Sequence, residues 1–127
     1  MNGLQPLLPK TQVKFLILGT FPSLKTRNFH QDFGLDAYYL NPTNQFWEMI
    51  EFCFPKVAQE AEQLRALIKA PFSKENAKMI MQLQQNIADI TGVAVWDCCK
   101  EAKNKLSKDS TIKEPKQNDL SKSPFKD

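Results

Sequence analysis

The sequence predicts an α/β domain built on a short parallel sheet. Two apolar runs have the length of buried strands, at residues 13–19 and 93–96. The stretch between them shows helical periodicity, and a strand–helix–strand order favours parallel strands with helices on the faces of the sheet. The chain has 127 residues, of which 42% are hydrophobic, which suits one domain with a modest core.

The first half of the chain predicts one strand and one helix. Residues 13–19 form an apolar strand that we expect to be buried and to end at a Gly/Pro turn. Residues 22–42 are polar and are expected to form a long loop. A helix is predicted at residues 44–54, with Thr43 or Asn44 as its cap.

Two further helices and a second strand follow. One helix is predicted over residues 55–69 and another over residues 73–91, with Ser73 as the cap of the latter and Gly92 as its stop. Residues 93–96 then form the second buried strand. The apolar positions expected to face the core of the three helices are Phe46, Trp47, Ile50, Phe54, Val57, Ala61, Leu64, Ile68, Met79, Ile80, Leu83, Ile87 and Ile90.

The net charge is concentrated at the end of the chain. Residues 100–127 hold eight lysines and five acidic residues, whereas residues 1–99 hold nine basic and nine acidic residues, so the net charge of +3 lies in the last part. A short helix is predicted at 98–106, and 103–127 reads as a polar basic tail. Such a tail can contact phosphates, but a solvated and poorly ordered end is favoured.

Cysteine usage and the length of the apolar runs indicate the cellular location of the protein. Cys53, Cys98 and Cys99 form no CxxC pair, so no disulfide framework is expected and a reducing cytoplasm is the predicted location. No apolar run approaches the roughly 18 residues of a membrane span. His30, the single histidine, has no second ligand at metal-site spacing, and we expect neither a metal nor a cofactor. His30 and the nearby Asp36 are predicted to be solvated in a surface loop. The protein is expected to be a monomer.

Two segments predict a binding pocket for a planar heterocycle. Residues 19–23 turn at the end of the first strand, and ligands of open α/β sheets bind outside the carboxyl ends of the strands. Residues 38–47 add two tyrosines together with amide and hydroxyl side chains. An aromatic ring can stack on a flat ligand while the polar groups bind its edge.

The same segments carry a family resemblance. The sequence GTFPS at residues 19–23 and YYLNPTNQFW at 38–47, with TGVAVWD at 91–97, resembles the uracil-DNA glycosylase superfamily, in its hypoxanthine and mismatch-type branch. The resemblance covers roughly residues 12–122. It implies a three-layer α/β/α domain with a short parallel sheet. The two strands predicted here are too few for that fold, so the 127 residues are expected to be a single partial domain, incomplete at the C-terminus.

The resemblance also implies an activity and a site. Such a protein is a DNA glycosylase that binds DNA and removes a deaminated base, hypoxanthine or uracil, during base excision repair. Many members position the attacking water with the Asn or Asp of Gly-x-Asn-Pro-Gly, where this chain has Phe21. In the hypoxanthine-type branch that catalytic role falls to Asn44, and Tyr39 takes the place of the base-stacking aromatic. The base-binding residues implied are Gly19, Thr20, Phe21, Pro22, Ser23, Tyr38 and Tyr39.

These residues also have structural interpretations that the sequence leaves open. Asn44 can cap the following helix without taking part in catalysis, and Tyr38 and Tyr39 can be packing residues with wet hydroxyls. Asp97, at the end of the second strand, can bind a ligand but more often such a residue caps the next helix. For the whole chain the alternative is a truncated, inactive glycosylase-like protein or a nucleobase-binding fragment.

Overall fold

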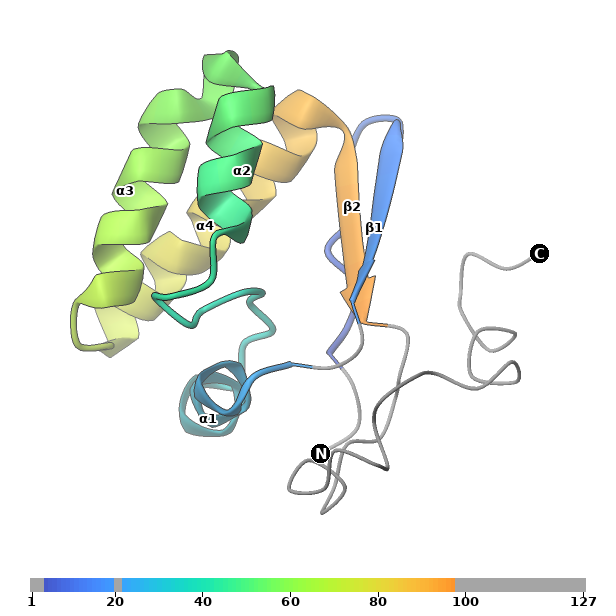
Figure 1. The fold of residues 1–127 in the computed structure, drawn as a ribbon. Helices are drawn as coiled ribbons and strands as arrows, with labels where there is room; N and C mark the ends of the chain where they lie inside the picture. Colours follow the sequence, from blue (N-terminus) through green and yellow to red (C-terminus); the bar gives the residue numbers. More distant parts are fainter. Residues whose placement is uncertain (1–3, 20–21, 98–127) are drawn as a thin grey trace, which may run out of the picture.

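The computed structural model describes residues 4–19 and 22–97; Thr20, Phe21, the helix predicted at 98–106 and the basic tail at 103–127 lie outside these ranges. The order of elements is β1 (Phe15–Gly19), α1 (Leu24–Phe33), α2 (Phe46–Cys53), the 3₁₀ turn η1 (Pro55–Val57), α3 (Ala58–Lys69), α4 (Lys74–Thr91) and β2 (Val93–Asp97). The described chain is therefore a mixed α/β domain with four α-helices and a two-stranded sheet (Figure 1).

The two strands are parallel neighbours, as the sequence predicts. Phe15 pairs with Val93 at one end and Gly19 with Asp97 at the other. The opposite edge of β2 is occupied by the N-terminal segment, because Leu7 and Val95 exchange backbone hydrogen bonds of 2.8 and 2.9 Å. β2 thus lies between two partners and is buried along its whole length.

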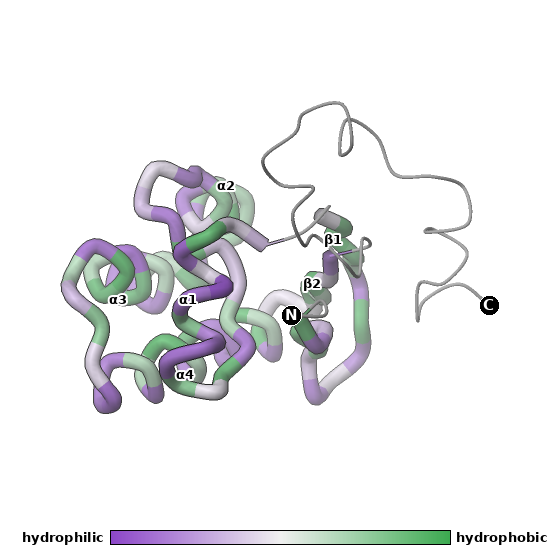
Figure 2. The backbone as a smooth tube through the Cα atoms, turned by 90° about the horizontal axis from the view of Figure 1, so that it is seen from below, coloured by the Kyte–Doolittle hydropathy of each residue, from purple (hydrophilic) through white to green (hydrophobic). Residues whose placement is uncertain are grey.

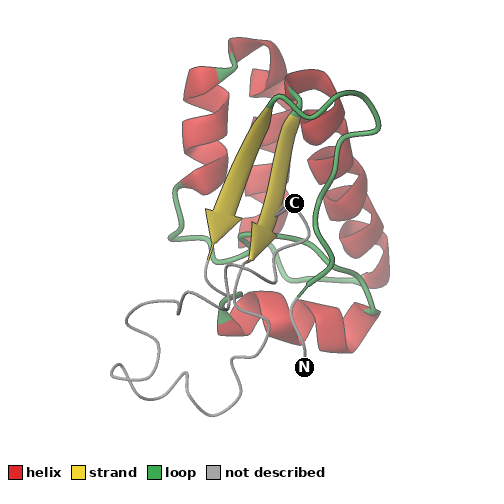
Figure 3. Ribbon diagram, turned by 90° about the vertical axis from the view of Figure 1, so that its right-hand side faces the viewer, coloured by secondary structure: helices red, strands yellow, loops and turns green. Residues whose placement is uncertain are grey.

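Helices α2, α3 and α4 lie on one side of the sheet, and α1 lies near the carboxyl ends of the strands (Figure 1). Viewed along the strands, the sheet stands to one side of the helices (Figure 2). Figure 3 looks onto the face of the sheet that these helices do not cover. The described residues therefore form two layers, with the main core between the helices and β2.

The helices predicted from periodicity are confirmed in outline. Ser73 accepts a hydrogen bond from the N–H of Asn76 at the start of α4, and Gly92 ends α4 with a φ of 77°. Most of the predicted inward positions are buried: Phe46, Trp47, Ile50, Val57, Ala61, Leu64, Ile68, Ile80, Leu83 and Ile87. The prediction that Met79 and Ile90 face the core is wrong, because these side chains are 52% and 40% exposed.

A helix stands where a loop was predicted. Residues 24–33 form α1, which Ser23 caps by accepting from the N–H of Thr26 and which ends at Gly34 with a φ of 68°. Phe29 is buried and meets the ring of Phe72 edge-on at a centroid distance of 5.2 Å. Packing on Phe72 stabilises a helix whose own apolar content is too low to reveal it.

The first strand is less buried than its composition suggests. Phe15, Leu16 and Leu18 are 51%, 39% and 44% exposed, so the prediction of a buried first strand is wrong for the described residues. β1 is an edge strand here, since its only partner among these residues is β2. An apolar run looks alike in central and edge strands, and only the neighbours decide its burial. Within the described ranges, no helix combines the length and apolar character needed to cross a membrane.

A polar cavity at the carboxyl ends of the strands

A cavity of about 220 Å³ opens where the two strands end. Its walls come from the start of α1, the segment before α2 and the end of β2. The lining residues are Pro22, Ser23, Leu24, Thr26, Tyr38, Tyr39, Asn41, Asn44 and Asp97. Five residues of the predicted site therefore meet in one place, namely Pro22, Ser23, Tyr38, Tyr39 and Asn44.

Asp97 supplies the charge of this cavity. The residue is 3% exposed, and no hydrogen bond or ion pair joins its carboxylate to another residue in the described part of the chain. Burial raises the pKa of Asp97 to about 6, because desolvation disfavours the ionised form. A carboxylate with this pKa is mostly ionised at neutral pH and can still accept a proton.

Gly19 allows the Asp97 carboxylate to occupy its position. A Cβ atom on Gly19 would lie 2.5 Å from Oδ1 of Asp97 and 3.2 Å from the hydroxyl oxygen of Tyr39. The sequence predicts that Gly19 lets a ligand approach the backbone. In the structure its bare backbone accommodates Asp97 and Tyr39 instead, and Gly19 is not among the residues that line the cavity.

Tyr39 forms an aromatic wall in an uncommon backbone conformation. Its φ is 54°, the only positive φ of a non-glycine residue among those described. One face of its ring stacks on Phe46 at a centroid distance of 4.1 Å and an interplanar angle of 26°. Burial, and then the charge of Asp97, raise the pKa of Tyr39 to about 12, so its hydroxyl stays protonated at neutral pH. The hydroxyl is thus a donor close to a carboxylate.

Tyr38 is held in the core by a buried amide. Gln84 of α4 accepts a hydrogen bond from the Tyr38 N–H at 2.9 Å and donates one to the Tyr38 carbonyl at 2.8 Å. The indole N–H of Trp47 donates to the same carbonyl, and the Tyr38 hydroxyl donates to the carbonyl of Gln5. Burial raises the pKa of Tyr38 strongly. Tyr38 therefore anchors the segment that presents Tyr39.

Ser23 and Thr26 tie the start of α1 to that segment. The Ser23 hydroxyl accepts from the Thr26 N–H at 3.3 Å and lies 3.2 Å from the Thr26 hydroxyl oxygen. Thr26, which is buried, accepts from the N–H of Leu40 at 3.2 Å. These bonds fix the spacing between the two walls of the cavity.

Asn44 lines the cavity and also supports the helix after it. Its Oδ1 accepts a hydrogen bond of 2.7 Å from the N–H of Phe46, the first residue of α2, while Gln45 occupies the formal cap position. An amide oxygen has a second lone pair, and the side-chain NH₂ has no partner among the described residues. The structural and the ligand-binding interpretations of Asn44 are therefore compatible.

The cavity combines groups that suit a small planar ligand and proton transfer. Its volume is below the roughly 300 Å³ typical of pockets for drug-sized ligands, so it suits a single heterocycle. Tyr39 offers a ring, Ser23 offers an acceptor because its O–H donates to Thr26, Asn44 offers donors and an acceptor, and Asp97 offers a base. Among the described residues, no group of three His, Cys, Asp or Glu side chains is placed to hold a metal ion.

The sequence carries only weak signals for two residues that matter in this site. Asp97 was interpreted mainly as a helix cap, although its place after a buried strand is a signal for a ligand site. Gln84 was not singled out. It lies on the apolar face of α4 four residues after Ile80, and a polar residue at such a position indicates a buried hydrogen-bond partner.

Comparison with known proteins adds no relative, since no family model, no curated protein and no solved structure matches the chain significantly.

Proposed function

We propose that this protein is a DNA glycosylase that hydrolyses the N-glycosidic bond of a deaminated base, hypoxanthine or uracil, in a domain of the uracil-DNA glycosylase type. The observation that carries the proposal is the buried carboxylate of Asp97, which pairs with no residue of the described ranges, in a cavity that also contains Tyr39 and Asn44. Asn44 and Asp97 are 53 positions apart in the sequence and line the same cavity at the strand ends.

The proposed substrate is a base that has left the duplex stack. A glycosylase reaches its bond only after the nucleotide is flipped out. A cavity of about 220 Å³ accepts the base alone, which leaves the sugar at its mouth. Tyr39 supplies the stacking surface, and the hydroxyl of Ser23 and the amide of Asn44 bind the polar edge of the base.

The chemistry proposed assigns separate roles to Asp97 and Asn44. Positive charge develops on the sugar as the bond to the base breaks, and negative charge develops on the departing base. Asp97 accepts a proton from the attacking water as a general base, and its negative charge stabilises the cationic sugar. Asn44 orients the water or the base through its amide, which has no pKa to tune.

The test is incision of oligonucleotides that contain hypoxanthine, uracil or a mismatched base, followed by alkaline cleavage of the abasic product. Asp97→Asn keeps the shape of the side chain and removes the base, so we expect turnover to fall by 10²- to 10⁴-fold, about the usual contribution of general base catalysis. Asn44→Ala should lose most of its turnover and retain DNA binding. The wild-type rate should also fall below about pH 6, as Asp97 becomes protonated.

Matched controls separate chemistry from folding. Gln82→Ala lies on the exposed side of α4 and should leave the incision rate unchanged. Full activity of Asp97→Asn would contradict the role of Asp97, and absence of incision of every substrate by the wild-type protein would contradict the glycosylase proposal.

A nucleobase-binding protein without hydrolytic activity is the second candidate. It is favoured by the hydrogen bond from Phe46 to Oδ1 of Asn44, because an amide that supports α2 is less free to orient a water. Binding of free hypoxanthine without incision of any oligonucleotide would select this candidate.

A further inference from the structure

The outer face of α1 borders a second hollow. It has a volume of about 600 Å³ and is lined by Leu24, Arg27, Asn28, His30 and Gln31. Leu24 also lines the Asp97 cavity, so this one side chain borders both spaces. Every side chain of the hollow except Leu24 can donate hydrogen bonds, and none is acidic.

Among the described residues, Arg27 has no partner for its charge. Its Nε is buried without a hydrogen bond, and none of the ion pairs within the described ranges includes it. Arg65, the other arginine of the chain, pairs with Glu51. Nε of Arg65 also lacks a hydrogen bond, so what distinguishes Arg27 is that no carboxylate pairs with its guanidinium within the described ranges. A buried donor without a partner is costly, and an acceptor bound in the hollow would satisfy it.

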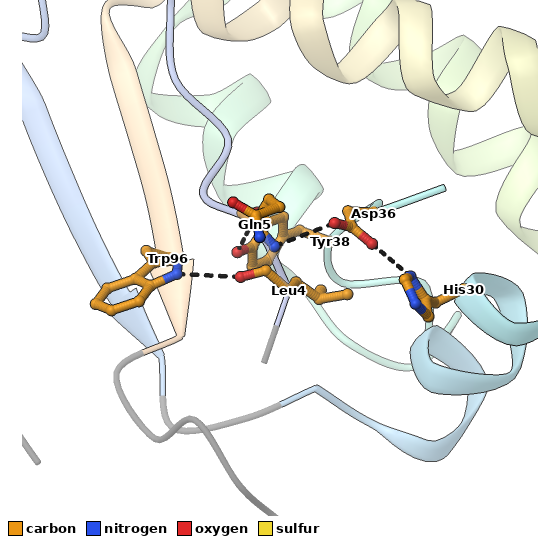
Figure 4. Close-up of polar contacts among 6 residues, drawn as sticks. All are labelled: Leu4, Gln5, His30, Asp36, Tyr38 and Trp96. Carbon is orange, nitrogen blue, oxygen red and sulfur yellow. Dashed lines mark hydrogen bonds and ion pairs between the residues drawn. The ribbon is translucent and has the colours of Figure 1, made fainter. Parts of the chain in front are cut away.

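His30 is held in position by a carboxylate. Its Nδ1 lies 2.5 Å from Oδ1 of Asp36, and the other oxygen of Asp36 accepts the N–H of Gln5 at 3.1 Å (Figure 4). The sequence-based prediction of a loop is wrong for His30, which lies in α1, and right for Asp36. Both side chains stay partly exposed, at 38% and 22%, but they pair with each other instead of being free in solvent. Both oxygens of Asp36 are engaged. Because Nδ1–H of His30 donates to Asp36, Nε2 of the neutral imidazole is an acceptor, and the donors that remain in the hollow belong to Arg27, Asn28 and Gln31.

We propose that this hollow binds a phosphodiester group of a nucleic-acid strand whose target base enters the Asp97 cavity; the inference rests on the function proposed above. The planar guanidinium of Arg27 matches two phosphate oxygens, and the amides of Asn28 and Gln31 supply further donors. A free base would need only the smaller cavity. The larger hollow contains a cation with no ion pair in the described part of the chain and no acidic residue among its described lining, so it suits the backbone of a strand that continues past the base.

The salt dependence of binding tests the phosphate contact. Binding of a short single-stranded oligonucleotide containing deoxyinosine is measured over a range of NaCl concentrations. Each phosphate contact contributes about 0.7 to the slope of log K against log salt for a single strand. Arg27→Gln should therefore reduce the magnitude of the slope by about 0.7 and weaken binding about tenfold at low salt. Lys78→Gln, an equal loss of charge on the exposed side of α4, should change neither.

A gain-of-charge variant excludes misfolding as the explanation. Gln31→Lys places a new cation at an exposed position of the same hollow and should increase the magnitude of the slope by about 0.7. Gln59→Lys, at an exposed position of α3, should not. The lysines of residues 100–127 are common to every variant, so their contribution cancels in these comparisons.

Binding of free hypoxanthine distinguishes failure of this inference from failure of the proposed function. Arg27→Gln should bind the free base as the wild type does. If hypoxanthine binds but neither variant alters the slope, or the wild type binds no oligonucleotide, the phosphate site is refuted and the base cavity stands. If the wild type binds neither ligand, both proposals fail.

Discussion

Gly19 and Asp97, which pair across the sheet, share one side-chain space. A Cβ on Gly19 would lie 2.5 Å from Oδ1 of Asp97, closer than real Cβ contacts. The carboxylate therefore lies over the bare backbone of β1 at the mouth of the strands. Glycine at the end of one strand and aspartate at the end of the next act as a unit that places a charge in the cavity.

This relationship predicts that Gly19→Ala destabilises the protein through Asp97. The added methyl group must displace the carboxylate or the Tyr39 hydroxyl, and overpacking of this kind costs about 1–3 kcal/mol. Urea denaturation measures the loss. In an Asp97→Ala background the methyl group has room, so the cost of Gly19→Ala should largely disappear. Equal costs in both backgrounds would contradict the contact.

Asp97 should make the folded state less stable as the pH rises. Its pKa is about 6 in the folded protein, above the ordinary value of 3.8, so the folded state holds the proton more tightly than the unfolded state between these values. The contribution of Asp97 to the free energy of unfolding should therefore fall by about 3 kcal/mol as the pH rises from about 4 to about 6. Urea denaturation of wild type and Asp97→Asn across this range isolates the contribution as a difference. A difference that stays constant with pH would show that Asp97 is not desolvated.

Gln84 should be essential for the position of the tyrosine segment. Gln84→Leu leaves the N–H and the carbonyl of Tyr38 without their amide partner, although Trp47 still donates to the carbonyl. We expect a loss of about 2–4 kcal/mol in the free energy of unfolding. Gln82→Leu on the exposed side of the same helix should stay within about 0.5 kcal/mol of the wild type. Thermal and urea denaturation of the two variants provide the comparison. Equal stabilities would show that the hydrogen bonds between Gln84 and Tyr38 do not hold the tyrosine segment in place.

Tyr39 should contribute to base binding through its ring rather than through its hydroxyl. Tyr39→Ala removes the stacking surface, which is worth about 1–3 kcal/mol per base and corresponds to roughly 5- to 150-fold weaker binding of free hypoxanthine. Tyr39→Phe keeps the ring and should bind hypoxanthine within about threefold of the wild type. Fluorescence titration measures both affinities. An equally large loss in the two variants would assign the effect to the hydroxyl beside Asp97 instead.

Much of the fold could be predicted because it depends on local patterns. The periodicity of residues 73–91 and the glycine after them specify α4, its cap and its stop. The order of apolar runs and helices predicts parallel pairing, which the register of Phe15 with Val93 confirms. Helix α1 escaped prediction because only Thr26 and Phe29 are buried in it, and its stability comes from packing on Phe72.

The sequence by itself predicted that the strand ends are where the site lies and that Ser23, Tyr39 and Asn44 belong to it. Residue types and their order along the chain are sufficient for that, since parallel strands finish at one edge. Only the tertiary structure decided whether these groups are buried and whether they are paired. Asp97 has its raised pKa because Gly19 leaves room for it in a desolvated place, and Arg27 forms no ion pair within the described ranges because no acidic side chain lines its hollow there. Burial and pairing depend on neighbours distant in sequence, which local patterns do not encode.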